Sequence, residues 1–114
     1  FSRNVYRGTA QAFAQDAQAL VLAQEAMAAG CDQALPPPQR AFLYLPYMHS
    51  ESALIQQQSV QLFDQPGLED NYRFALLHRD IVVRFGRYPH RNAQLGRVST
   101  PAELEFLQQP GSSF

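Results

Sequence analysis

The sequence predicts an all-α fold of antiparallel helix hairpins, a bundle of about five helices forming a single domain over residues 1–114. Two observations predict it. Apolar residues recur at helical spacing in segments that Gly and Pro separate, and no stretch alternates apolar and polar residues long enough for a strand. With 114 residues and 46% hydrophobic content, the chain is long enough to bury one core.

The first helix is expected to begin at its cap, Thr9, after an irregular lead-in over residues 1–8, and to end at Gly30. Its residues are mostly Ala, Gln and Leu, which favour the helical state. At helical spacing, the residues that form its core face are Phe13, Ala17, Leu20, Val21 and Met27 or Ala28.

The second helix is expected over residues 39–45, after a connector at 32–38 that three consecutive prolines keep extended. Pro46 should kink or end this helix, so that residues 47–51 form a turn. The helix is apolar nearly all round, which indicates that neighbours enclose it; the residues concerned are Phe42, Leu43, Tyr44 and Leu45.

The third helix should be capped by Ser50 or Ser52 and end at residues 65–67, with Leu54, Ile55, Leu62 and Phe63 as its apolar residues. The fourth is expected over residues 69–85 and ends at Gly86. Its buried stripe is predicted to comprise Phe74, Leu77, Ile81 and Phe85.

The fifth helix is short and should start at Ser99 or Thr100. Thr100, Pro101 and Glu103 combine a cap, a proline in the first turn and the acid of a capping box. Residues 110–114 are expected to be coil.

Charge and composition exclude several classes of function. A net charge of -1 argues against a general binder of nucleic acid or membrane surfaces, and no run of about 18 apolar residues is present. All nine basic residues are arginines, which excludes Schiff-base chemistry at a lysine. The single cysteine, Cys31, excludes an internal disulfide and a cysteine-ligated metal cluster, and it fits a cytoplasmic protein. No cofactor is expected.

A dense polar turn follows the fourth helix, where His90, Arg91 and Asn92 are consecutive. Six arginines lie between Arg73 and Arg97 against one acid, and a guanidinium grips a carboxylate or phosphate with two parallel hydrogen bonds. The arginines that we consider as anion ligands are Arg3, Arg7, Arg87, Arg91 and Arg97. The alternative is that they only tie helix ends to acids such as Asp16, Glu51 or Asp80.

The three histidines are candidates for acid and base roles or for metal ligands. Their spacing fits no local metal motif, so no metal site is expected. His78 lies on an apolar helical face and is interpreted as a core residue. His49 and His90 lie in turns beside other polar groups and are the candidates for a functional role.

Three runs of residues resemble a known family: FSRNVYRG at 1–8, FLYLPYMHSE at 42–51 and RFGRYPHRN at 84–92. They are similar to a bacterial domain-of-unknown-function family, number 924, and the likeness extends over the whole chain. The resemblance implies a fold like that of tetratricopeptide repeats, and it implies no activity. Family members carry a further N-terminal helical region, so we interpret this chain as the C-terminal part of a longer protein.

Two functional hypotheses follow. The first is a binding module for an acidic peptide or a small anionic ligand. Its candidate site residues are Arg3, Arg7, His49, Glu51, Arg87, His90, Arg91 and Asn92. The alternative is a small hydrolase, with His49 and His90 as acid and base and with Arg87 or Arg91 stabilising an oxyanion.

A third interpretation is that the polar cluster only braces the hairpins. Each polar segment lies at a helix boundary, where backbone groups need partners, so residues 3–7, 49–51 and 87–92 are predicted to meet. Glu51 is expected to be the carboxylate that pairs with one of the arginines. The oligomeric state is left open.

Overall fold

The computed structural model describes Phe13 and residues 16–112, and within this part of the chain it contains helices and no strand. The all-α prediction is confirmed. The elements in order are α2 (Asp16–Ala28), the 3-10 helix η2 (Cys31–Ala34), α3 (Pro37–Met48), α4 (Ala53–Phe63), α5 (Glu69–Phe85), the 3-10 helix η3 (Pro89–Arg91), α6 (Asn92–Leu95) and α7 (Pro101–Leu107). The predicted cap at Thr9 lies outside the described residues.

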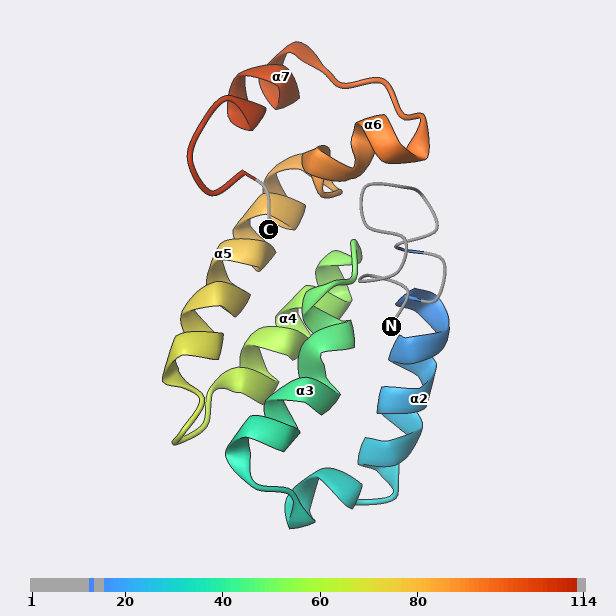
Figure 1. Cartoon of the computed structure of the whole chain (residues 1–114), viewed down its shortest axis with the longest axis vertical. Helices are drawn as coiled ribbons and strands as arrows, with labels where there is room; N and C mark the ends of the chain where they lie inside the picture. The colour runs from blue at the N-terminus through green and yellow to red at the C-terminus, as the bar shows by residue number, and fades with distance from the viewer. Residues whose placement is uncertain (1–12, 14–15, 113–114) are drawn as a thin grey trace.

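The helices pack in chain order, α2 on α3, α3 on α4 and α4 on α5. Figure 1 shows these four helices running along the long axis, with α6 and α7 across one end. No helix of the described segments is long and apolar enough to cross a bilayer. The tetratricopeptide-like arrangement expected from the family resemblance stays a prediction.

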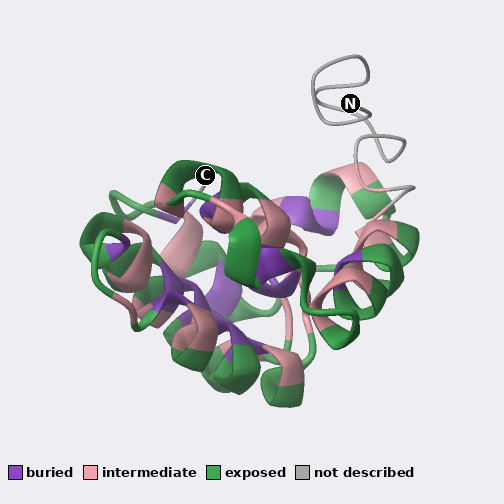
Figure 2. Cartoon of the chain, turned by 90° about the horizontal axis from the view of Figure 1, so that it is seen from below, coloured by how far each residue is buried: buried purple, intermediate pink, exposed green. Residues whose placement is uncertain are grey.

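The core lies between α3, α4 and α5, where buried residues face inward (Figure 2). Its buried residues are Ala41, Tyr44, Met48, Phe63, Leu68 and Ala75. A second cluster joins the end of α5 to the connection beyond it and comprises Ile81, Val82 and Tyr88, with Phe85 and Phe106 packed against it. This second cluster positions the polar segments that follow α5.

Local signals correctly placed the start of α4, both ends of α5 and the start of α7. The Ser52 side chain accepts a hydrogen bond from the Ile55 N–H at the start of α4. The range of α5 is the predicted one, and Gly86 follows it with φ 74°, a left-handed conformation that costs glycine little. Thr100 and Glu103 form the predicted capping box of α7.

The prediction for the second helix was wrong at both ends. Pro36 caps α3 and Pro37 is its first residue, a position where the missing proline N–H has no helical partner to lose. Pro46 lies inside the helix, which continues to Met48. The final turn is held by burial, since Tyr47 and Met48 are only 5% and 4% exposed.

The predicted buried faces need correction as well. Phe74 and Leu77 are more than half exposed, and the buried face of α5 comprises Ala75, His78, Ile81 and Val82. This face is one residue further along the helix, because the small Ala75 lets α4 and α5 approach closely. The core role expected of His78 is confirmed.

The buried faces predicted for two other helices, α3 and α2, were also partly wrong. Phe42 of α3 was expected to be enclosed and is 78% exposed. On α2 the predicted face included Ala17, Val21 and Ala28, which are exposed, whereas Leu20 and Met27 are half-buried. The buried residue of α2 is Ala23. A small side chain again marks the contact between helices.

Phe63→Ala should lower the free energy of unfolding by about 3–5 kcal/mol, because Phe63 is completely buried and truncation leaves a cavity. Phe42→Ala is the matched control on the exposed face, and its effect should stay within about 0.5 kcal/mol. Urea unfolding followed by circular dichroism measures both. Equal losses would contradict the assignment of the core.

Candidate functional site

The polar region at one end of the bundle is organised around Tyr88, which is fully buried. Its hydroxyl donates to the Met48 carbonyl oxygen at 2.5 Å and accepts from Gln56 Nε2 at 2.6 Å. Its backbone N–H donates to Glu51 Oε2 at 2.7 Å. These bonds hold the segment after α5 against the turn between α3 and α4.

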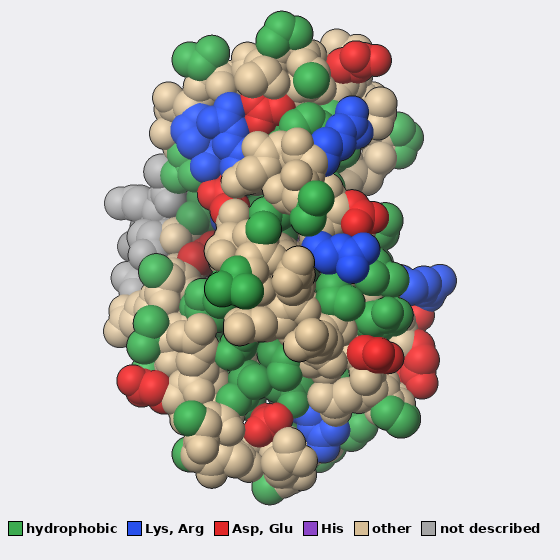
Figure 3. Space-filling model, turned by 180° about the vertical axis from the view of Figure 1, so that it is seen from behind, with side chains coloured by type: hydrophobic (Ala, Val, Ile, Leu, Met, Phe, Trp, Pro, Cys, Tyr) green, Lys and Arg blue, Asp and Glu red, His purple; other side chains and the backbone are tan. Residues whose placement is uncertain are grey.

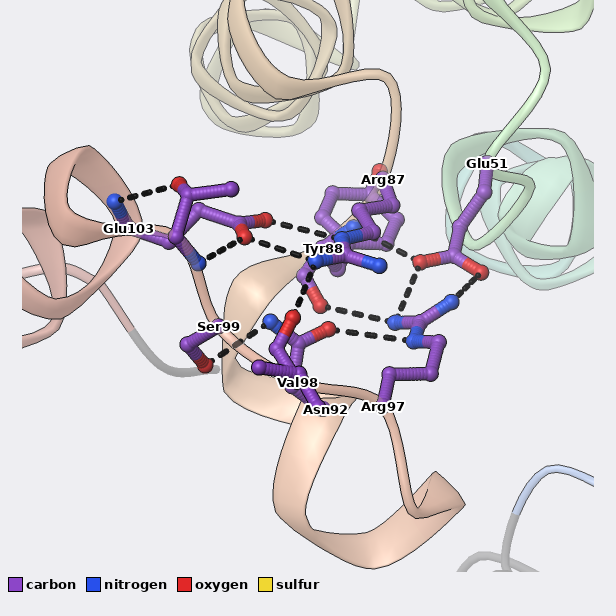
Figure 4. A network of polar contacts seen from close by, with 9 residues as sticks. Glu51, Arg87, Tyr88, Asn92, Arg97, Val98, Ser99 and Glu103 are labelled. Atoms are coloured by element: carbon purple, nitrogen blue, oxygen red, sulfur yellow. Dashed lines mark hydrogen bonds and ion pairs between the residues drawn. The ribbon is translucent and has the colours of Figure 1, made fainter.

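Glu51 and Arg97 form a two-pronged ion pair, with both nitrogen-to-oxygen distances at 3.0 Å (Figure 4). Arg97 also donates to Asn92 Oδ1 and to the Tyr88 carbonyl oxygen. Burial alone would raise the pKa of Glu51. Hydrogen bonds from Arg97 and from the Tyr88 N–H, with the positive charges of Arg97 and Arg91, outweigh burial and lower that pKa.

Arg87 and Glu103 make a second two-pronged pair at 2.8 and 2.7 Å, which ties α7 to the end of α5 (Figure 4). Arg87 also donates to the Val98 carbonyl oxygen. Glu103 is 2% exposed and accepts from the Thr100 N–H as well. Hydrogen bonds from Arg87, more than any other cause, lower the pKa of Glu103 to about 2.

Asn92, a candidate site residue, has its side chain engaged within the protein. It begins α6, is 1% exposed, and its Nδ2 donates to Ser99 Oγ at 3.0 Å while its Oδ1 accepts from Arg97. The side chain therefore links α6 to Ser99 in the segment before α7, and it helps to fix the Arg97 guanidinium (Figure 4).

Arg91 lies in a different environment. It is 4% exposed, and its guanidinium carbon lies 4.6 Å from the Phe13 ring centroid and 4.7 Å from that of Tyr88. Its Nη2 donates to the His49 carbonyl oxygen at 2.9 Å and lies 3.8 Å from Asp16 Oδ2. The guanidinium is thus held between two rings with its edge toward α2 and the α3–α4 turn.

A cavity of about 350 Å³ opens beside Arg91, between α2, the end of α3 and α6. Its polar wall comprises Asp16, His49, Ser50, Glu51 and Arg91. Its apolar wall includes Phe13, Leu20 and Leu95. A positively charged group beside an apolar wall is suited to a small ligand that carries a carboxylate or a similar anion.

The structure brings some predicted site residues together and separates others. His49, Glu51 and Arg91 line the cavity, and Arg87 and Asn92 belong to the adjoining brace. His90 packs near the Tyr88 ring, 5.9 Å between centroids, and is not among the described residues that line the cavity. Arg3 and Arg7 lie outside the described residues.

Sequence reasoning did not find Glu103 as the partner of Arg87. The capping box contained the signal, since its glutamate is held at a helix start where other donors can reach it. Within residues 16–112 and at Phe13, no group of three His, Cys, Asp or Glu side chains is placed to hold a metal ion.

The fold and this site define a class: an all-α domain of sequentially packed helices, braced at one end by glutamate–arginine pairs beside a small cavity. The chain belongs to the family of bacterial proteins of unknown function numbered 924 (DUF924), which matches residues 1–111. Of the three runs that carried the resemblance, the second and third supply the α3–α4 turn and the segment around Tyr88.

A solved structure of a protein of unknown function from Agrobacterium tumefaciens, ATU0120, is similar to this chain, with 46% sequence identity and a TM-score of 0.87. The likeness covers 95% of this chain and 61% of that one, so the chain spans about 61% of that protein's length. A comparison with curated proteins found no match.

Glu51→Ala should destabilise the fold, because it removes the carboxylate that accepts from the Tyr88 N–H and pairs with Arg97. We expect the free energy of unfolding to fall by about 2–3 kcal/mol. This is less than for a fully buried pair, because the Glu51 and Arg97 side chains each keep a quarter of their surface exposed. Chemical unfolding measures it. Glu105→Ala on the exposed side of α7 is the control, and an equal effect there would contradict the bracing role of Glu51.

Stability should fall on acidification because of Glu103. The folded state lowers the pKa of this carboxyl from 4.5 to about 2. The free energy of unfolding that Glu103 contributes is therefore fully present above pH 4.5 and is lost as the pH falls toward 2. Glu103→Gln should remove that part of the decline, of order 1–2 kcal/mol. Urea midpoints between pH 6 and pH 2.5 measure it, and parallel curves for the two proteins would refute it.

Proposed function

We propose that this domain is a binding module that accepts a small anionic group, such as the carboxylate of an acidic peptide, in the cavity beside Arg91. The observation that carries the proposal is the position of this guanidinium at a cavity wall, whereas Arg87 and Arg97 each face a glutamate in a two-pronged pair. Among the described residues, Arg91 is the arginine that lines this cavity.

The setting of Arg91 favours ligand exchange. Its separation from Asp16, 3.8 Å, is wider than the 2.7–3.0 Å of the two glutamate–arginine pairs, so that pair is the loosest of the three. A ligand carboxylate would take the place of Asp16, and one anion would replace another without leaving the buried cation uncompensated. The rings of Phe13 and Tyr88 hold the guanidinium in place before the ligand arrives.

The apolar wall indicates the remainder of the ligand. Leu20 and Leu95 border the same cavity, so a short aliphatic chain next to the anion would bury apolar surface there. A tetratricopeptide-like stacking of the hairpins, if present in the whole protein, would extend this cavity into a groove of the kind in which helical repeats hold peptides.

Fewer of the observed positions support the hydrolase alternative than support the binding module. Its acid and base, His49 and His90, would have to reach one substrate, and of these two only His49 lines the cavity among the described residues. Its oxyanion donor would have to be Arg91, because the Arg87 side chain is engaged by Glu103 and by the Val98 carbonyl oxygen.

Calorimetric titration with hexanoate and with a short acidic peptide tests the binding role. Arg91→Met should weaken binding by roughly tenfold or more, the effect of losing a charge-assisted hydrogen bond. Asp16→Asn should strengthen it, because the competing carboxylate is removed. Raising the salt concentration should weaken binding by the wild type.

Arg73→Met is the matched control, since Arg73 is exposed and pairs with Asp70 on the surface. Hexanamide, the neutral analogue of hexanoate, should not bind measurably. The proposal fails if no carboxylate binds at low salt, or if Asp16→Asn weakens binding as much as Arg91→Met does. The opposite signs expected for these two variants separate a ligand effect from simple unfolding.

A further inference from the structure

A second cavity, of about 430 Å³, lies at the other end of α2, between α2, η2, α3 and α4. Its polar wall contains one carboxylate and five neutral amides: Asp32 with Gln24, Gln33, Gln58, Gln61 and Gln65. In the described part of the chain, no arginine lines it. Asp32 is therefore the charged side chain of this cavity, whereas the cavity beside Arg91 is lined by that arginine together with Asp16 and Glu51.

Asp32 is a buried carboxylate whose hydrogen bonds from other described side chains reach one of its two oxygens. It is 5% exposed, and its Oδ2 accepts from the Tyr44 hydroxyl at 2.6 Å and from Gln33 Nε2 at 3.3 Å. No group of the described residues donates to Oδ1, and no arginine among them forms an ion pair with this side chain. A carboxylate that is nine-tenths buried normally has a cation or several donors around it.

The nearest arginine is directed elsewhere. Arg40 donates through Nε to the Asp32 backbone oxygen at 3.1 Å, through Nη2 to the Leu35 carbonyl oxygen at 2.9 Å, and through Nη1 to Gln65 Oε1 at 2.7 Å. These bonds clamp η2 onto α3 and α4 and fix the place of Asp32. The clamp builds the cavity wall without neutralising the Asp32 side chain.

The aromatic wall strengthens the preference for a cation. Burial, followed by the influence of Asp32, raises the pKa of Tyr44, and the same two causes raise the pKa of Tyr47. Both rings therefore stay neutral at physiological pH. Neutral aromatic rings and a carboxylate are the groups that bind ammonium ions, and Met27 and Leu62 supply apolar surface for a carbon chain.

We propose that this cavity binds a small organic cation whose primary ammonium group donates to Asp32 Oδ1. The carbon chain of the ligand lies against Met27 and Leu62, and its remaining polar groups bond to the glutamine amides at the rim. The site recognises an alkylammonium compound and excludes anions.

Putrescine is the probe, titrated into the protein and followed by calorimetry and by backbone amide NMR shifts. We expect binding with the largest shifts in η2 and at the facing ends of α2 and α4. Asp32→Asn should weaken binding roughly 10- to 100-fold, because the shape is kept and the charge is lost. Glu105→Gln removes the same charge from an exposed position of α7 and should leave the affinity unchanged.

1-Butanol, which has the chain without the charge, should not bind measurably. Tyr44→Phe should keep putrescine binding, because Asp32 then offers both oxygens to the cation, which shows that the carboxylate and not the hydroxyl is the ligand. The proposal is overturned if putrescine does not bind the wild type at millimolar concentration, or if folded Asp32→Asn binds it equally well. Arg91→Met should not change putrescine binding, so this test is independent of the anion site.

Discussion

The hydrogen bonds and the ion pair of the Glu51 carboxylate hold together the polar region at the end of this domain where α3 and α5 end. It receives the Tyr88 N–H and both arms of Arg97, so that one side chain in the α3–α4 turn fixes the path of the chain after α5. The Tyr88 hydroxyl then reaches the Met48 carbonyl oxygen, and Arg91 reaches that of His49. Both carbonyls lie at the C-terminal end of α3, where the helix itself supplies no N–H donor, and Gln56 Nε2 also donates to that of Met48.

The same geometry explains the arginine surplus of residues 73–97. Arg87 and Arg97 meet acids that lie 16 and 46 residues away in the sequence, and Arg84 lies over the rings of Phe85 and Phe106. Figure 3 shows arginines and acids interspersed on one face of the molecule, without a large patch of a single sign. On that face, the local excess of positive charge in the sequence does not produce a positive surface, and anion binding has to be argued from one cavity.

The start of α4, both ends of α5 and the start of α7 were predictable from the sequence because capping is local chemistry, whereas the ends of α3 were not. Thr100 and Glu103 are three residues apart, and Gly86 is adjacent to the end of α5. Helix faces were less predictable, because two apolar stripes on α5 overlap at Ile81 and only the approach of α4 decides between them. The meeting of the turns at 49–51 and 87–92 followed from helix-end chemistry, whereas the partner of each arginine depended on distant packing.

Helix α2 connects the two cavities, and its packing suits that position. Ala23 is its one buried residue among those described, while Leu20 borders the first cavity and Met27 the second. A helix that buries little of its own surface leaves space against its neighbours at both ends, and elements with few buried contacts are where ligand sites are commonly found. The opposite charges of Arg91 and Asp32 then give the two ends different chemistry, although the same helix forms a wall of each.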